Sequence, residues 1–173
     1  MSDDAPTSTS RPDPMSLPTV QQRGFFYEEL QEGVRYVHIP GKTVEDAENG
    51  MFSALTMNPA ALHHDAVAGE QGEYGKRLVN SLLTLSTLVG LSVGHITVGT
   101  TVANLGFARV DFPAPVFAGD TLFASTVVLS KRLSRSRPEV GIVVLEHTAR
   151  NQDGVVVCVA ERTAMMRRQP QDA

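Results

Sequence analysis

This chain of 173 residues has no tryptophan and a single cysteine, and aromatic residues make up only 6% of it. The single cysteine, Cys158, cannot form an internal disulfide, which suits a reducing compartment and a cytoplasmic location. Because Cys158 lies in the apolar run 155–160, we expect a buried small hydrophobe and not a nucleophile. With a formal net charge of −4 and few aromatic platforms, the chain predicts no nucleic-acid partner.

Charge is absent from the stretch 78–108, which contains no Asp, Glu, Lys or Arg. A membrane span needs about 20 predominantly apolar residues, but Asn80, Ser81 and His95 interrupt this stretch. We therefore interpret it as a buried helix over 78–93 followed by a buried strand, and we expect no membrane partner. The N-terminal end is polar and proline-rich without an apolar segment, so we expect no secretory signal.

The remaining composition is that of an ordinary globular domain, with 42% hydrophobic and 20% charged residues. The length suits one domain. Residues 1–22 are dominated by Ser, Thr, Pro and Asp, which predicts a disordered tail. We expect the folded domain to span 23–167 and a short polar tail to occupy 168–173.

Hydrophobic periodicity predicts the elements. Residues 34–39 have strand composition, and Thr43 is a plausible N-cap for an amphipathic helix over 44–55. Asn58-Pro59 should end that helix, and 59–77 should form a loop with at most one short helix. Four long strands follow the buried helix, at 101–111, 121–131, 141–151 and 155–165, with a hairpin signal at Asp153-Gly154. The order predicts an α+β fold in which an antiparallel sheet wraps one helix.

Histidines supply the first candidate for chemistry. His63 can act as a general acid or base near neutral pH, and Asn58 could orient a carbonyl or a water. The alternative is that Asn58-Pro59 is only a helix stop and that the histidines are surface residues. His63, His64 and Asp65 are adjacent, so their side chains diverge, and we expect no metal site.

Two further features could bind a ligand. Asn80-Ser81 begins the buried helix, where free N–H groups could bind an oxygen as negative charge develops on it. The alternative is a simple helix cap. Arg132, Arg135 and Arg137 lie in a basic segment between two strands and could contact phosphates, or could simply belong to a solvated turn.

At these residues the chain resembles a known protein family. Asn58-Pro59 followed by His63-His64-Asp65 is similar to the motif Asp-x-Asn-Pro-x-His-x-Asp of MaoC-like dehydratases and R-specific enoyl-CoA hydratases. Residues 112–121 resemble that family's strand-to-strand turn, which contains Pro-Val-x-x-Gly-Asp, and 26–33 resemble its opening segment.

The resemblance implies a single hot-dog domain, in which a long central helix is wrapped by an antiparallel sheet. It also implies a homodimer or a larger assembly of dimers, an acyl-CoA substrate, and reversible hydration of a 2-enoyl-CoA to a 3-hydroxyacyl-CoA. Coenzyme A would be part of the substrate, so no separate cofactor is expected. His63, Asn58 and Asp65 would be catalytic, Ser81 and Asn80 would hold the thioester oxygen through backbone N–H groups, and Arg132, Arg135 and Arg137 would contact the CoA phosphates.

The chain also departs from the family's pattern. Thr56 stands where the family has its catalytic Asp, two residues lengthen the spacing from Asn58 to His63, and Asn80-Ser81 replaces the family's His-Gly. The missing carboxylate could come from Asp65, Glu70 or Glu73.

One branch of the family carries Thr-Met-Asn in place of the usual motif residues, and this chain resembles it at Thr56-Met57-Asn58, at Leu62-His63 and at 78–81. The resemblance implies a substrate of that branch, which is a short, branched or dicarboxylic acyl-CoA such as mesaconyl- or itaconyl-CoA. Two alternatives stay open. One is a non-catalytic acyl-CoA-binding hot-dog subunit. The other is a hot-dog thioesterase, which would need a carboxylate near the central helix.

Overall fold

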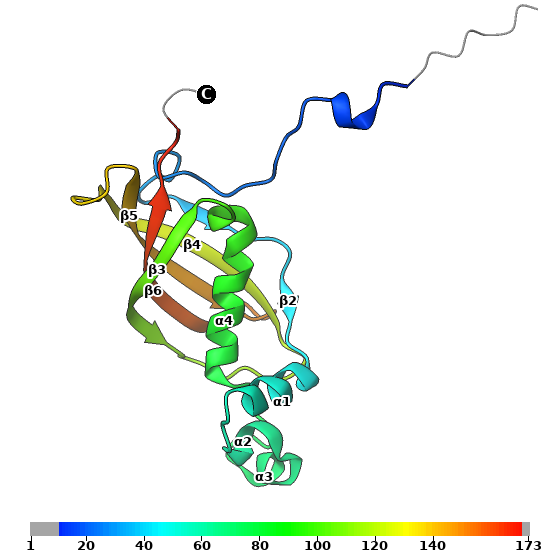
Figure 1. Ribbon diagram of the computed structural model, residues 1–173. Helices are drawn as coiled ribbons and strands as arrows, with labels where there is room; N and C mark the ends of the chain where they lie inside the picture. The colour runs from blue at the N-terminus through cyan, green and yellow to red at the C-terminus, as the bar shows by residue number, and fades with distance from the viewer. Residues whose placement is uncertain (1–10, 171–173) are drawn as a thin grey trace, which may run out of the picture.

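The chain forms one antiparallel sheet with a helix across it and a small helical lobe at one end (Figure 1). The structure is a computed structural model that describes residues 11–170. Its elements are the 3-10 turn η1 (Pro14–Ser16), β1 (Arg35–Val37), β2 (Lys42–Thr43), α1 (Asp46–Leu55), α2 (Ala61–His64), α3 (Ala66–Gln71), α4 (Ser81–Ser92), the π-helical turn η2 (Val93–Thr97), β3 (Thr101–Asp111), β4 (Thr121–Leu133), β5 (Val140–Arg150) and β6 (Val156–Arg167).

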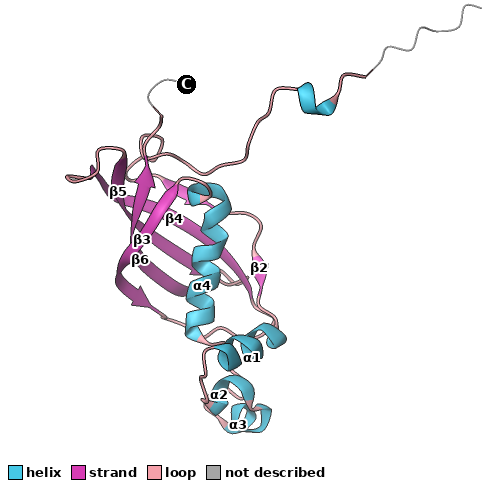
Figure 2. Ribbon diagram, in the orientation of Figure 1, coloured by secondary structure: helices cyan, strands magenta, loops and turns pink. Residues whose placement is uncertain are grey.

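The sheet has the strand order β1-β4-β5-β6-β3, and β2 pairs separately with β4 (Figure 2). The four long strands confirm the prediction. The β5–β6 hairpin also confirms the turn signal, since Gly154 has a φ of 77° that an L side chain rarely adopts. Strand β3 forms one edge of the sheet and β1 the other.

Helix α4 lies against one face of the sheet and contacts β4, β5 and β6 (Figure 1). Leu88 on the helix is fully buried in an apolar cluster with Leu122, Ala149 and Cys158. The predicted burial of Cys158 is therefore confirmed. Burial, followed by the nearby charge of Asp111, raises the pKa of its thiol to about 11, so the thiolate is scarce at neutral pH.

Helix α1 differs from the prediction in its start and in the face that it buries. The helix begins at Asp46, because Thr43 pairs in β2 and Glu45 takes the N-cap position. The predicted apolar face is wrong, since Met51 and Leu55 are exposed while Asn49 and Ser53 are buried. Asn49 is buried because its amide bonds to backbone groups of the next segments. Polar interactions therefore override hydrophobic periodicity here.

The charge-free stretch also differs from the prediction. Helix α4 and strand β3 form as expected, but neither is enclosed in the single chain. Leu82 on α4 and Val93 at the start of η2 are 55% and 38% exposed, and Leu105 and Phe107 on β3 are 50% and 38% exposed. The absence of charge therefore marks an uncharged surface on one side of α4 and along the part of β3 that precedes Arg109.

The segment 59–77 holds two short helices, α2 and α3, where at most one was expected. Residues 1–10 and 171–173 of the predicted tails lie outside the described residues, and the domain boundaries stay predictions. None of the helices in the described part of the chain combines the length and apolar character that crossing a membrane requires.

Candidate functional site

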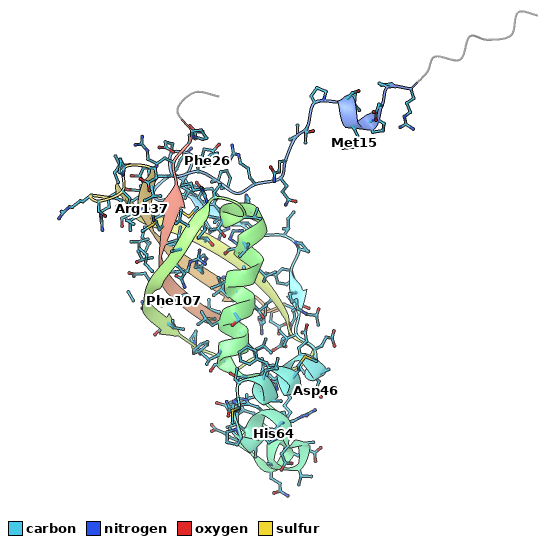
Figure 3. All side chains as sticks on the ribbon, viewed as in Figure 1. Met15, Phe26, Asp46, His64, Phe107 and Arg137 are labelled. Atoms are coloured by element: carbon cyan, nitrogen blue, oxygen red, sulfur yellow. The ribbon has the colours of Figure 1, made fainter. Side chains whose placement is uncertain are left out.

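The lobe formed by α1, α2 and α3 lies at one end of helix α4 (Figure 3). His63 and His64 both belong to α2, but they face different surroundings. His63 is half-buried and lines a cavity, whereas His64 is exposed and does not line it. Of the two adjacent histidines, only His63 is placed for chemistry in this cavity.

The ring of His63 has a defined orientation. Its Nδ1 lies 3.0 Å from the carbonyl oxygen of Leu78. Because a carbonyl oxygen only accepts hydrogen bonds, Nδ1 donates and carries the proton of the neutral ring. Nε2 is then left with a lone pair, which is the form that a general base requires.

Asn49 fixes this arrangement from helix α1. Its Nδ2 donates to the carbonyl oxygens of His63 and Leu78 at 2.9 and 3.0 Å. Its Oδ1 accepts the N–H of Asn80 at 2.8 Å. A single amide, 1% exposed, therefore ties the catalytic candidate to the start of α4. Sequence reasoning missed Asn49, and the only available signal was a polar residue within an otherwise amphipathic helix.

The start of α4 agrees with the predicted helix boundary. Asn80 is the N-cap, and its Oδ1 accepts the N–H of Leu82 at 3.0 Å. The N–H of Ser81 makes no hydrogen bond within residues 11–170. Ser81 lines the same cavity as His63. The positive end of the helix dipole and a free N–H donor therefore lie beside the histidine.

The cavity has a volume of about 270 Å³. Apolar side chains and a few polar groups line it: His63, Tyr74, Leu78, Val79, Ser81, Thr84, Phe112, Pro113, Ala114, Pro115, Val116 and Val157. The turn at 112–116, which carried part of the family resemblance, thus forms one wall. No carboxylate lines the cavity. This leaves His63 as the acid–base candidate within it.

The other predicted catalytic groups bond locally. The Oδ1 of Asn58 accepts the N–H of Ala60 at 3.0 Å, and Asp65 caps α3 by accepting the N–H of Ala68 at 3.0 Å. Thr56 donates to the backbone of α1. None of the three lines the cavity, so catalytic roles for Asn58 and Asp65 stay predictions.

Among the three acidic candidates for the missing carboxylate, Glu73 is the one that lines a hollow next to the cavity. It lines a neighbouring hollow that shares Tyr74 and Leu78 with the first cavity. Glu70 and Asp65 line neither hollow. The choice among these residues remains a prediction.

The basic segment lies far from the histidines. Arg132 is the last residue but one of β4, and Arg135 and Arg137 follow the strand, at the end of the sheet opposite the helical lobe (Figure 3). Arg137 pairs with Glu139 at 2.8 Å. A single chain therefore does not bring the basic segment and His63 together.

Metal ligands do not gather in the described part of the chain. No group of three or more His, Cys, Asp or Glu side chains within residues 11–170 could hold a metal ion. The expectations of no metal and no separate cofactor stay predictions.

Two solved structures share the fold described above. A conserved hypothetical protein of Mycobacterium tuberculosis, described as having a double hot-dog fold, superimposes with a TM-score of 0.79 over 89% of this chain and 47% of its own, at 21% identity. The MaoC-like dehydratase from Rhodospirillum rubrum gives a TM-score of 0.76 at 26% identity, over 86% of this chain and all of its own. This chain is therefore a single hot-dog domain, as predicted. Because residues 29–151 match the MaoC like domain, the chain belongs to that family.

Two curated proteins are similar to this chain in sequence. The beta-methylmalyl-CoA dehydratase of Chloroflexus aurantiacus is 26% identical over 117 residues, which are 68% of this chain and 33% of the relative. The mesaconyl-CoA hydratase of Cereibacter sphaeroides is 29% identical over 145 residues, which are 84% of this chain and 42% of the relative. The chain therefore spans less than half the length of these relatives.

Proposed function

We propose that this chain is a hydro-lyase that adds water to a 2-enoyl-CoA and removes it from the corresponding 3-hydroxyacyl-CoA. The observation that supports this most is that one cavity is lined both by a residue that can act as a base and by a residue with a free backbone N–H. The free Nε2 of His63 and the free N–H of Ser81 both belong to residues that line it. The family membership and the names of the two relatives support the same reaction class.

The two groups divide the chemistry between them. In hydration, His63 Nε2 takes a proton from water while the water oxygen forms a bond to C3 of the enoyl thioester. The C2–C3 double-bond electrons move toward the thioester carbonyl, whose oxygen gains negative charge. The N–H of Ser81 and the N-terminal dipole of α4 stabilise that charge. His63 then returns its proton to C2, so one acid–base group serves both steps.

The acyl group that we propose is short and branched or dicarboxylic. The segment Thr56-Met57-Asn58 and the names of both relatives support this choice. A cavity of about 270 Å³ also suits a small acyl group better than a long one.

The working assembly that we propose is a homodimer in the cytoplasm. The exposed apolar side chains Leu82 on α4 and Leu105 and Phe107 on edge strand β3 belong to the charge-free stretch 78–108. Exposed apolar surface without charge is typical of a protein interface. Since the basic segment lies at the opposite end from His63, Arg135 and Arg137 would contact CoA phosphates only at the site of a second copy.

The function is tested by comparing His63→Ala with His64→Ala. Loss of ultraviolet absorbance by a conjugated enoyl-CoA measures hydration. His63→Ala should lower kcat by about 10²- to 10⁴-fold, which is typical for loss of a general acid–base group. His64→Ala changes the adjacent exposed histidine and should leave kcat unchanged. Equal rates for His63→Ala and the unchanged protein would remove the catalytic assignment.

A second candidate function has one observation in its favour. No carboxylate lines the cavity, which suits a subunit that binds acyl-CoA without reacting it. Binding of the enoyl-CoA with no loss of its absorbance would favour that candidate. Release of free thiol would instead indicate a thioesterase.

The role of the basic segment is tested with two substrates. Replacing Arg135 and Arg137 with Ala should raise KM for CoA esters far more than for pantetheine esters, which lack the nucleotide phosphates. An equal rise in KM for both esters would contradict the phosphate contact.

A further inference from the structure

A row of polar side chains crosses the buried face of the sheet beneath helix α4. Thr126 on β4 lies opposite His147 on β5, and Arg162 on β6 lies diagonally beyond, opposite Leu145. Thr126 and His147 are fully buried, and Arg162 is 4% exposed. Apolar positions flank this row along each strand, in the two separate apolar clusters of the core. Buried polar groups in such a place need an explanation, because burying them without partners is costly.

Thr126 and His147 belong to a continuous hydrogen-bonded chain of four side chains that begins at the surface with His95 and His38. The Nδ1 of exposed His95 lies 3.2 Å from the Nδ1 of His38. The Nε2 of His38 lies 2.8 Å from the hydroxyl of Thr126, which lies 2.7 Å from the Nδ1 of His147. Each neutral imidazole and the hydroxyl has one proton to donate, and the hydroxyl oxygen can also accept two hydrogen bonds. In one of the allowed arrangements every group donates inward, from His95 toward His147.

The inner end of this chain has no partner. The Nε2 of His147 and the Nε of Arg162 are both buried without a hydrogen-bond partner within residues 11–170. Arg162 forms no ion pair there either. Burial lowers the pKa of Arg162, and no acidic side chain offsets that effect.

The nearest carboxylates on the same strands cannot neutralise Arg162. Glu146 and Glu161 lie opposite each other in the register of β5 and β6. Each is the immediate neighbour of a buried residue in the row, and side chains alternate between the faces of a strand. Both glutamates therefore project from the other face of the sheet. The Nε of Arg162 is therefore buried without a hydrogen-bond acceptor and without a carboxylate beside it, which is costly for a charged group.

We propose that His147 and Arg162 hold a single small monovalent anion in the core of the domain, beneath helix α4. The anion accepts the Nε–H of Arg162 and the Nε2–H of His147. It is of the size of a halide, nitrate or formate. This site is separate from the cavity lined by His63, and it does not depend on the proposed hydration.

The hydrogen-bonded chain fits this ligand when every group donates inward. If His95 donates to His38, His38 to Thr126, and Thr126 to Nδ1 of His147, then His147 carries its proton on Nε2. In the register of β5 and β6, His147 and Arg162 lie on the same face of the sheet. The small neighbours Ala160 and Ala164 on β6 limit the side-chain bulk on either side of Arg162. The anion supplies the negative charge that this row of donors lacks.

The first test titrates small anions into the full chain. The protein is exchanged into sodium gluconate, which is then replaced stepwise by chloride, bromide, nitrate or formate at constant ionic strength. Thermal unfolding should show a saturable rise in Tm, because an anion bound only by the folded state stabilises it. Arg162→Met should abolish this rise. Arg167→Met removes an exposed arginine from the same strand and should keep it.

The second test locates the ligand. Crystals grown in sodium bromide should show an anomalous peak within hydrogen-bonding reach of His147 Nε2 and Arg162 Nε. This measurement needs no variant, so it holds even if Arg162→Met fails to fold. Three results would overturn the proposal: a Tm independent of the anion, an ordered water without anomalous signal, or a carboxylate of a second subunit in that position.

Discussion

At the scale of single residues, His63 and His64 show how adjacent side chains of one type acquire different roles. Both were visible in the sequence, and the family motif favoured His63. The structure separates them, since only His63 lines the cavity and bonds to Leu78. Asn49 could not be found in this way, because its three partners are backbone groups brought together by the fold.

The role of Asn49 leads to a prediction. Asn49→Ala leaves the carbonyls of His63 and Leu78 and the N–H of Asn80 without their amide partner. Unsatisfied buried groups cost about 1–3 kcal/mol each, so urea unfolding should show a loss of at least that size. Its kcat should also fall, because His63 loses its support. Asn58→Ala loses only a local turn contact and should cost less, and an equal loss in both variants would contradict the account.

The burial of His38 predicts that acid lowers the stability of the folded protein. Burial, followed by the nearby His95, lowers the pKa of His38 from 6.5 to about 4. Above pH 6.5 neither state of the chain protonates this residue, so it adds no pH dependence. As the pH falls from 6.5 to about 4, the unfolded chain binds a proton that the folded chain does not, and the free energy of unfolding decreases.

His38→Gln should flatten this slope between pH 6.5 and 4, by up to about 1.4 kcal/mol per pH unit. Urea unfolding at several pH values measures it. His64→Gln changes an exposed histidine and serves as the control. A slope that His38→Gln leaves unchanged would show that His38 is not the group responsible.

At the scale of elements, the sequence predicted the strands and the position of the central helix but not the packing of α1. Long strands rich in Val, Thr and Leu follow from local propensity. The face of a short helix depends instead on what lies beside it. Met51 and Leu55 have the spacing of a core face, yet Asn49 and Ser53 are buried. Asn49 makes hydrogen bonds to backbone groups of distant segments, which favour this orientation, and no local pattern contains that information. The Ser53 hydroxyl has no such partner within residues 11–170.

The start of the domain gives a prediction at this scale. Gly24 donates its N–H to Val98 at 2.7 Å, and a Cβ at Gly24 would lie 2.2 Å from the carbonyl oxygen of Ile96. Because that oxygen belongs to the backbone, it cannot rotate away. Gly24→Ala should therefore destabilise the chain by about 1–3 kcal/mol, as overpacking does.

Gly50 provides the matched control, because a Cβ there meets nothing within 4 Å. Gly50→Ala lies within helix α1 and should stabilise the chain by about 0.5–1 kcal/mol. Thermal or urea unfolding of both variants measures the difference. Loss of stability at Gly50 or none at Gly24 would contradict the packing described.

At the scale of the whole molecule, the exposed apolar residues of α4 and of the charge-free part of β3 predict the assembly. Leu105 on edge strand β3 is 50% exposed. Leu105→Lys should shift the proposed dimer to a monomer in sedimentation or light-scattering measurements, since a charge would be buried in the interface. Leu133→Lys, at an exposed leucine at the end of β4, should leave the dimer intact. A dimer that tolerates Leu105→Lys would place the interface elsewhere.

We propose that this hot-dog domain hydrates a 2-enoyl-CoA with His63 as its acid–base group. The most direct measurement adds the purified chain to a panel of enoyl-CoA esters, including mesaconyl-CoA, and follows the absorbance of the conjugated thioester. We expect loss of that absorbance, fastest for a short branched or dicarboxylic ester, without release of free thiol. Unchanged absorbance across the panel, despite measurable binding of the esters, would contradict it.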